Sequence, residues 1–94
     1  MPAIGVLTLE LRIEHAHSLK EKRHVVKSLK DRLRRKFNVS VAEIDGMDLH
    51  NSAVIAVATV SSSKPFAEQV LQSVERESSE LLGPMLVRVE ADWW

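Results

Sequence analysis

Apolar residues along this chain follow two different spacings, and the order of these spacings most constrains the fold. Over residues 4–15 every second residue is apolar, which is typical of a β-strand with one buried face. Over residues 18–37 the apolar residues recur at helical spacing. The remaining segments are a β-rich stretch at 39–44, an apolar run at 53–60, a second helical pattern after Pro65 and renewed alternation at 85–92. The predicted order is therefore β-α-β-β-α-β.

This order predicts the arrangement of the strands. Right-handed crossovers place the first and third strands side by side at the centre of the sheet, flanked by the fourth and the second. The run 53–60 is apolar on both faces, as a central strand requires. We therefore expect an α+β chain with a ferredoxin-like fold, in which two helices cover one face of a four-stranded antiparallel sheet. Residues 1–94 are expected to form a single domain.

The ends and buried faces of the helices can also be predicted. Ser18 and Glu21 have the spacing of a capping box, and Asn38 is a suitable left-handed C-cap. Leu29 and Leu33 should face the sheet. The second helix should start in the loop 61–65 and end at Gly83-Pro84. Its predicted apolar side consists of Phe66, Val70, Leu71, Val74 and Leu81.

Positive charge is concentrated on the first predicted helix. Nine of the 13 Lys and Arg residues lie there against two acids, although the chain has no formal net charge. Lys and Arg at helical spacing can follow a phosphate backbone. The alternative is a solvated helix face that balances an acidic second helix. The candidate phosphate-binding residues are Lys20, Arg23, Lys27, Lys30, Arg34 and Arg35.

The chain lacks the sequence features of most enzymes and of the common RNA-binding modules. It has no cysteine, nucleophile elbow, phosphate loop, dinucleotide fingerprint, RNP aromatic pattern or GxxG loop. Its acids at 43–48 suit a strand end and a tight turn. The histidines at 15, 17, 24 and 50 lack further ligands placed to complete a metal site. We expect no catalytic residue, cofactor or metal, and, without a leader or a bilayer-spanning run, a cytoplasmic protein.

The sheet face opposite the helices is a second candidate interaction surface. The first strand presents a mixture of apolar and charged residues there, but the run 53–60 should also present apolar side chains, either Ile55 and Val57 or Val54 and Val60. Two large rings follow the last strand. These patterns predict a homodimer through the open face, unless the tail covers its own sheet. The candidate self-association residues are Ile55, Val57, Trp93 and Trp94.

Two long segments resemble a known family. SLKEKRHVVKSLKDRLRRKFNVSVAEID and DLHNSAVIAVATVSS are similar to the YlxP-like family of small bacterial proteins of unknown function. The resemblance extends from the GVLTLEL opening to the VEAD segment. It implies a ferredoxin-like fold and a protein often encoded among translation and ribosome-maturation genes, and it implies no catalytic residues.

Three classes of function remain open at this stage. The first is a binding module for RNA or a ribosomal particle that uses the helix at 18–35. The second is a protein-interaction or self-association module that uses the open sheet face. The third is a small-ligand regulatory domain or an enzyme of the ferredoxin-like type. Fold alone does not choose among them.

Overall fold

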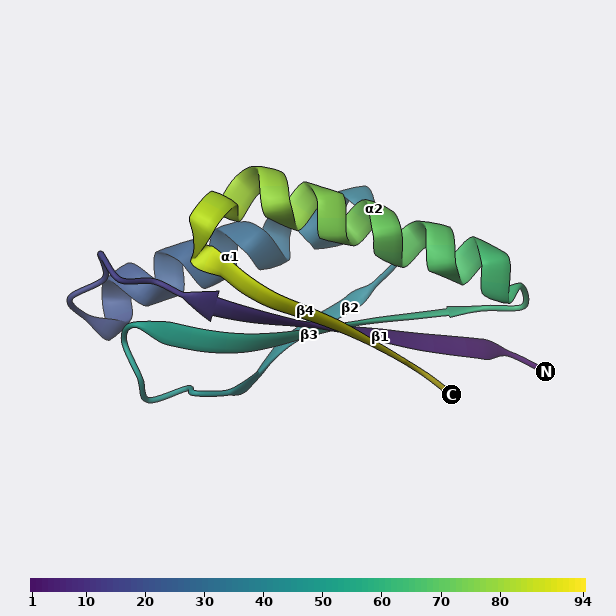
Figure 1. Ribbon diagram of the computed structural model, residues 1–94, viewed down its shortest axis with the longest axis horizontal. Coiled ribbons are helices and arrows are strands. Elements are labelled where there is room, and N and C mark those ends of the chain that lie inside the picture. The colour runs from purple at the N-terminus through teal and green to yellow at the C-terminus, as the bar shows by residue number, and fades with distance from the viewer.

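The computed structural model describes residues 1–94 and contains the six predicted elements in the predicted order (Figure 1). A short 3-10 turn, Gly83–Met85, joins the last helix to the last strand. The elements are β1 (Ala3–Arg12), α1 (Leu19–Lys36), β2 (Ser40–Asp45), β3 (Ser52–Ser61), α2 (Lys64–Leu82) and β4 (Leu86–Trp93).

The four strands form one antiparallel sheet in the order β2-β3-β1-β4, which confirms the ferredoxin-like prediction. Both helices lie on the same side of this sheet, and its other side carries no helix (Figure 1). Within the helical layer, α1 packs beside β2, whereas α2 packs over β1, β3 and β4. The edge strand β2 is thus flanked by α1, and the other edge strand, β4, is flanked by α2.

Strand register decides which side chains enter the core. Leu7 pairs with Val57 and Leu9 pairs with Ile55, and all four side chains are buried beneath the helices. Because side chains alternate along a strand, Val54 and Val60 point to the opposite, open face. The prediction that Ile55 and Val57 lie on the open face was therefore wrong.

The first helix begins as predicted but ends differently. Ser18 has extended backbone angles, and its hydroxyl accepts a hydrogen bond from the Glu21 N–H. Glu21 in turn accepts one from the His17 N–H. At the other end, the extended residue Phe37 is the C-cap, and its N–H donates to the Leu33 carbonyl. The prediction of a left-handed cap at Asn38 was wrong, since no residue except glycine has a positive φ angle.

The second helix is rotated relative to its predicted apolar side. Its buried residues are Ala67, Leu71, Val74, Ser78 and Leu82. Phe66 was expected to face the sheet, but it is 58% exposed. Small residues at 67 and 78 explain the difference, because they allow close approach of the helix to the sheet yet carry little apolar signal in the sequence. Ser63 caps the start and Gly83, with a φ angle of 56°, ends the helix.

Gly5 leaves room for the edge strand β4 to place the ring of Trp93 against the core. A Cβ atom at this position would lie 2.6 Å from the Trp93 ring and 2.8 Å from Leu71 Cδ1. The ring of Trp93 thus covers the bare backbone of β1 on the helix side, and the Lys64 ammonium lies 5.2 Å from the ring centroid. Trp93 is consequently part of the domain's own packing.

A buried hydroxyl in α2 offers a test of this core. Ser78 is 0% exposed, and its Oγ has no hydrogen-bond partner. Since a buried, unpaired hydroxyl is unfavourable, Ser78→Ala should raise the free energy of unfolding by about 1–2 kcal/mol. The exposed neighbour Ser79 controls for helix propensity, and Ser79→Ala should give about 0.5 kcal/mol or less. Urea denaturation measures both, and a Ser78→Ala protein less stable than Ser79→Ala would contradict the packing described here.

Candidate nucleic-acid interface

A buried lysine fixes the position of α1 against the β2–β3 loop. Lys22 is only 1% exposed, and its ammonium has three donors. Two of them reach backbone carbonyls of the loop, Gly46 O at 2.6 Å and Leu49 O at 2.7 Å. The third partner is the Glu43 carboxylate, 2.8 Å away on β2. The ammonium thus has two hydrogen bonds and one close ion pair, although Glu43 Oε2 itself accepts no hydrogen bond of good geometry. The paired opposite charge and the two carbonyls allow a charge to be buried at this position.

Lys22 is one of the nine basic residues of the first predicted helix, and it was not among the candidate site residues. A signal was nevertheless present in its spacing. Lys22 precedes Val26 by four residues, Leu29 by seven and Leu33 by eleven, so it lies at the centre of the buried helix face. A lysine on such a face requires acceptors from another part of the chain, and the β2–β3 loop supplies them.

Four of the six candidate phosphate-binding residues surround one hollow. It lies between α1 and the free edge of β2, has a volume of about 370 Å³, and is lined by Arg23, Lys27, Lys30 and Arg34 together with Val26, Asp31 and Glu43. Within it, the Arg34 guanidinium donates to the Val41 carbonyl of β2 at 2.8 Å. Arg34 thereby holds the helix against the sheet edge.

The candidate side chains differ in how far their charge is already neutralised. Lys27 pairs with Asp31 at 2.6 Å, and this hydrogen bond holds the pKa of the Asp31 carboxyl below its usual value. Lys20, Arg23, Lys30 and Arg35 form no ion pair. Lys20 and Arg35 lie outside the hollow. We call Lys20, Arg23, Lys27, Lys30, Arg34 and Arg35 the basic flank.

Two other cations of α1 form ion pairs with α2. Lys36 lies 2.8 Å and Arg32 3.5 Å from Glu77 of α2. The hydrogen bond from Lys36 lowers the pKa of the Glu77 carboxyl. These two ion pairs link the basic helix to the acidic one on the side of α1 that faces α2.

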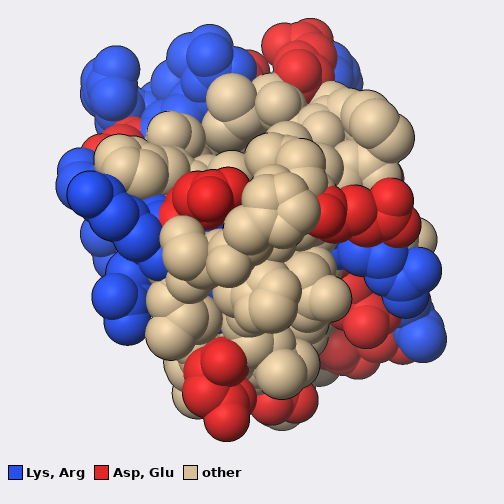
Figure 2. Space-filling model, turned by 90° about the vertical axis from the view of Figure 1, so that its left-hand side faces the viewer, with Lys and Arg blue, Asp and Glu red and all other residues tan.

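Figure 2 shows the end of the molecule that carries the start of α1 and the β2–β3 loop. Lys and Arg atoms gather along its left-hand edge, and acidic atoms are sparse there. The centre of this view is mostly uncharged. Further Lys and Arg atoms lie on the right of this view beside acidic ones, so the left-hand edge carries a large group of the positive charge but not all of it.

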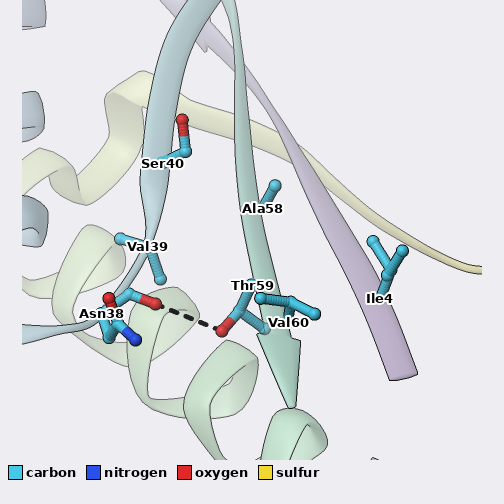
Figure 3. Close-up of a pocket in the computed structure, with 7 residues that line it drawn as sticks. All are labelled: Ile4, Asn38, Val39, Ser40, Ala58, Thr59 and Val60. Carbon is cyan, nitrogen blue, oxygen red and sulfur yellow. Dashed lines mark hydrogen bonds between the residues drawn. The ribbon is translucent and has the colours of Figure 1, made fainter. Parts of the chain in front are cut away.

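The open sheet face has a different character. Its exposed or half-buried apolar residues include Ile4, Val6, Val54, Val60 and Ile44. At one end is a hollow of about 360 Å³, drawn in Figure 3. Ala58 lies beside Ser40 of the neighbouring strand, Val60 lies further along the strand of Ala58, and Ile4, Asn38, Val39 and Thr59 complete the lining.

The two terminal rings lie on opposite sides of the sheet. Trp93 packs against Leu71 on the helix side. Trp94 continues the strand through two backbone hydrogen bonds with Ile4, and strand alternation places its ring on the open face. It is 71% exposed. Of the four predicted self-association residues, Trp94 alone presents its side chain to the open face.

No group of three or more His, Asp or Glu side chains lies close enough together to hold a metal ion. Neither helix combines the length and the apolar composition that crossing a lipid bilayer requires.

Comparison with known proteins identifies the family. A family described as proteins of unknown function, DUF503, matches residues 4–89. The chain belongs to this family. It is also 44% identical over 71 residues to the uncharacterised protein YlxP of Bacillus subtilis (strain 168), which covers 76% of this chain and 77% of that protein. The resemblance to the YlxP-like family noted from the sequence is confirmed.

Solved structures resemble this chain in fold. The de novo designed protein Foldit4 superposes with a TM-score of 0.64 at 16% identity, over 100% of this chain and 97% of its own. A dimeric ferredoxin-like protein of unknown function from Thermobifida fusca superposes with a TM-score of 0.51 at 15% identity, over 97% and 90% of the two chains. At these identities the similarity establishes the fold and no function.

The role of Lys22 can be tested against a neighbouring lysine. Lys22→Met leaves the Glu43 carboxylate without its paired cation and two loop carbonyls without a donor, so it should lower the free energy of unfolding by about 3 kcal/mol or more. Lys20→Met changes an exposed, unpaired residue and should cost within about 0.5 kcal/mol. Chemical denaturation gives both values. Equal effects of the two changes would show that the ammonium of Lys22 does not hold the loop.

Proposed function

We propose that this protein binds RNA, either free or within a ribosomal particle, through the basic flank. The observation that carries the proposal is the convergence of Arg23, Lys27, Lys30 and Arg34 on one hollow beside β2. Phosphate groups are bound chiefly by such Lys and Arg side chains, and the binding needs no base-specific pocket. The shape of the flank also supports it, because a helix with cations on successive turns presents them along a line.

The distribution of ion pairs supports the same function. Helix α1 directs Arg32 and Lys36 to Glu77, and it directs Lys22 to Glu43. Arg23 and Lys30 have no acidic partner. The two acids that line the hollow, Asp31 and Glu43, are paired with Lys27 and Lys22, so Arg23 and Lys30 remain available to an anion. A face serving stability alone would gain from acidic partners for these two cations as well.

Self-association through the open sheet face is a second candidate function. It is favoured by the exposure of Trp94 beside exposed apolar residues, since large contiguous apolar patches on soluble chains commonly mark interfaces. The two candidates use different sides of the molecule, so they are compatible. The mass in solution relative to the 10.6 kDa chain tests this second candidate.

The RNA-binding proposal is tested by matched charge reversals. Arg23→Glu with Lys30→Glu removes two unpaired cations of the flank and should abolish binding of a mixed-sequence single-stranded RNA at moderate salt. The control pair, Arg12→Glu with Arg76→Glu, changes net charge equally at exposed residues elsewhere and should bind nearly as well as the unaltered protein.

Salt dependence provides the quantitative criterion for the same experiment. With about three to five phosphates contacted, the logarithm of the association constant should fall with the logarithm of salt at roughly −0.7 per phosphate. The flank variant should show a shallower slope. Binding that is insensitive to salt, or that both double variants weaken equally, would rule out the basic flank as the RNA-binding surface.

A further inference from the structure

The open sheet face has a ridge at one end and a depression beside it. Val60, Ile4 and Trp94 are neighbours across three strands, because Ile4 pairs with Val60 on one side and bonds to the Trp94 backbone on the other. All three are exposed. The next level along the strands carries the small residues Ser40 and Ala58. This change from large to small side chains forms the hollow of Figure 3.

We propose that the occupant of this face is a second copy of the chain, related by a twofold axis, and that Trp94 of each copy fills the hollow of the other. This inference rests on the proposed self-association and specifies its geometry. A hollow lined by the small side chains of Ala58 and Ser40 is not filled by the same small side chains of a second copy, so the partner must supply a large one. Trp94 is the largest exposed side chain on this face.

The strand order brings these two features together. A twofold axis that lies between the two sheets and runs parallel to the strands places β4 of one copy over β2 of the other. Rotation about this axis also leaves each residue of the second copy at the same height along the strand direction as in the first. Trp94 is at the level of Ile4 and Val60, and the hollow extends on the β2 side from this level to the next one, which carries Ser40 and Ala58. The ring is thus delivered over the hollow without any change of the fold.

Charges at the other end of the face are complementary under the same axis. Asp45 pairs with Val54, which pairs with Glu10, which pairs with Arg88, so the four residues share one level across the sheet. The axis therefore places Arg88 of each copy over Asp45 of its partner. Within one copy, Arg88 lies 3.4 Å from Glu90 and 3.7 Å from Glu10, so positive and negative side chains already lie side by side at this end of the face. The basic flank lies on the helix side and does not enter this contact.

The two edge-to-edge arrangements bring like charges together. Pairing two β2 edges would place one basic flank against another. Pairing two β4 edges would bring together the acids Glu68 and Glu75, which line a hollow between α2 and β4. Face-to-face packing avoids both. The area of the sheet face also reaches what a specific interface needs, which is about 1,000 Å² in total. Four strands about 4.8 Å apart and roughly 27 Å long give about 500 Å² per copy.

The test uses light scattering and sedimentation over a range of micromolar concentrations. The unaltered chain should form a dimer. Trp94→Ala should raise the dimer dissociation constant by about 30-fold or more, because buried aromatic anchors dominate interface energetics. Phe66→Ala removes another exposed aromatic ring, which lies on α2 outside the interface, and should leave the constant unchanged.

A complementation experiment identifies the contact itself. Ala58→Phe fills the hollow from within and should weaken the dimer as Trp94→Ala does. In a mixture of the two variants, the intact Trp94 of one chain meets the intact hollow of the other, so heterodimers should form more tightly than either homodimer. A dimer that tolerates Trp94→Ala, or variants that fail to complement, would overturn the proposed contact while leaving self-association in place. A chain that stays monomeric would overturn both.

Discussion

The burial of the Lys22 ammonium is the interaction on which the candidate interface depends. It joins three elements, because its carrier is α1 and its oxygen partners belong to β2 and to the β2–β3 loop. A charge in this position tolerates little displacement, since each lost oxygen leaves part of it unpaired. The face of α1 that turns toward the edge of β2 is thereby determined, and Arg23, Lys27 and Lys30 follow from it. A core residue thus sets the direction of the surface charges.

The fold could be predicted because the spacing of apolar residues differs clearly between the strands and the helices. The faces were harder to predict, and the run 53–60 shows why. Since this strand is apolar at every position, its sequence does not distinguish Ile55 and Val57 from Val54 and Val60, and the choice depends on register with β1. Lys22 shows the other difficulty. Its acceptors are backbone carbonyls more than twenty residues away, which no local pattern encodes.

The two proposed surfaces lie on opposite layers of the molecule and would act together. In the proposed dimer the sheets face one another, so both helical layers point outward. The twofold axis then places the two basic flanks at opposite edges of the assembly. A dimer would therefore offer two separated phosphate-binding surfaces. An extended RNA or a particle surface that contacts both would bind with higher apparent affinity, because the second contact forms within the same complex.

NMR mapping of RNA contacts distinguishes the basic flank from the open sheet face as the RNA-binding surface. In a titration of isotope-labelled protein with mixed-sequence single-stranded RNA, the account predicts shifts in the side-chain signals of Arg23 and Lys30. It also predicts shifts in the backbone amides of β2 near Val41, which border the same hollow. Signals from the open sheet face, such as those of Thr8 and Ala56, should not move. Shifts confined to the open face, with those of the basic flank unchanged, would contradict the account.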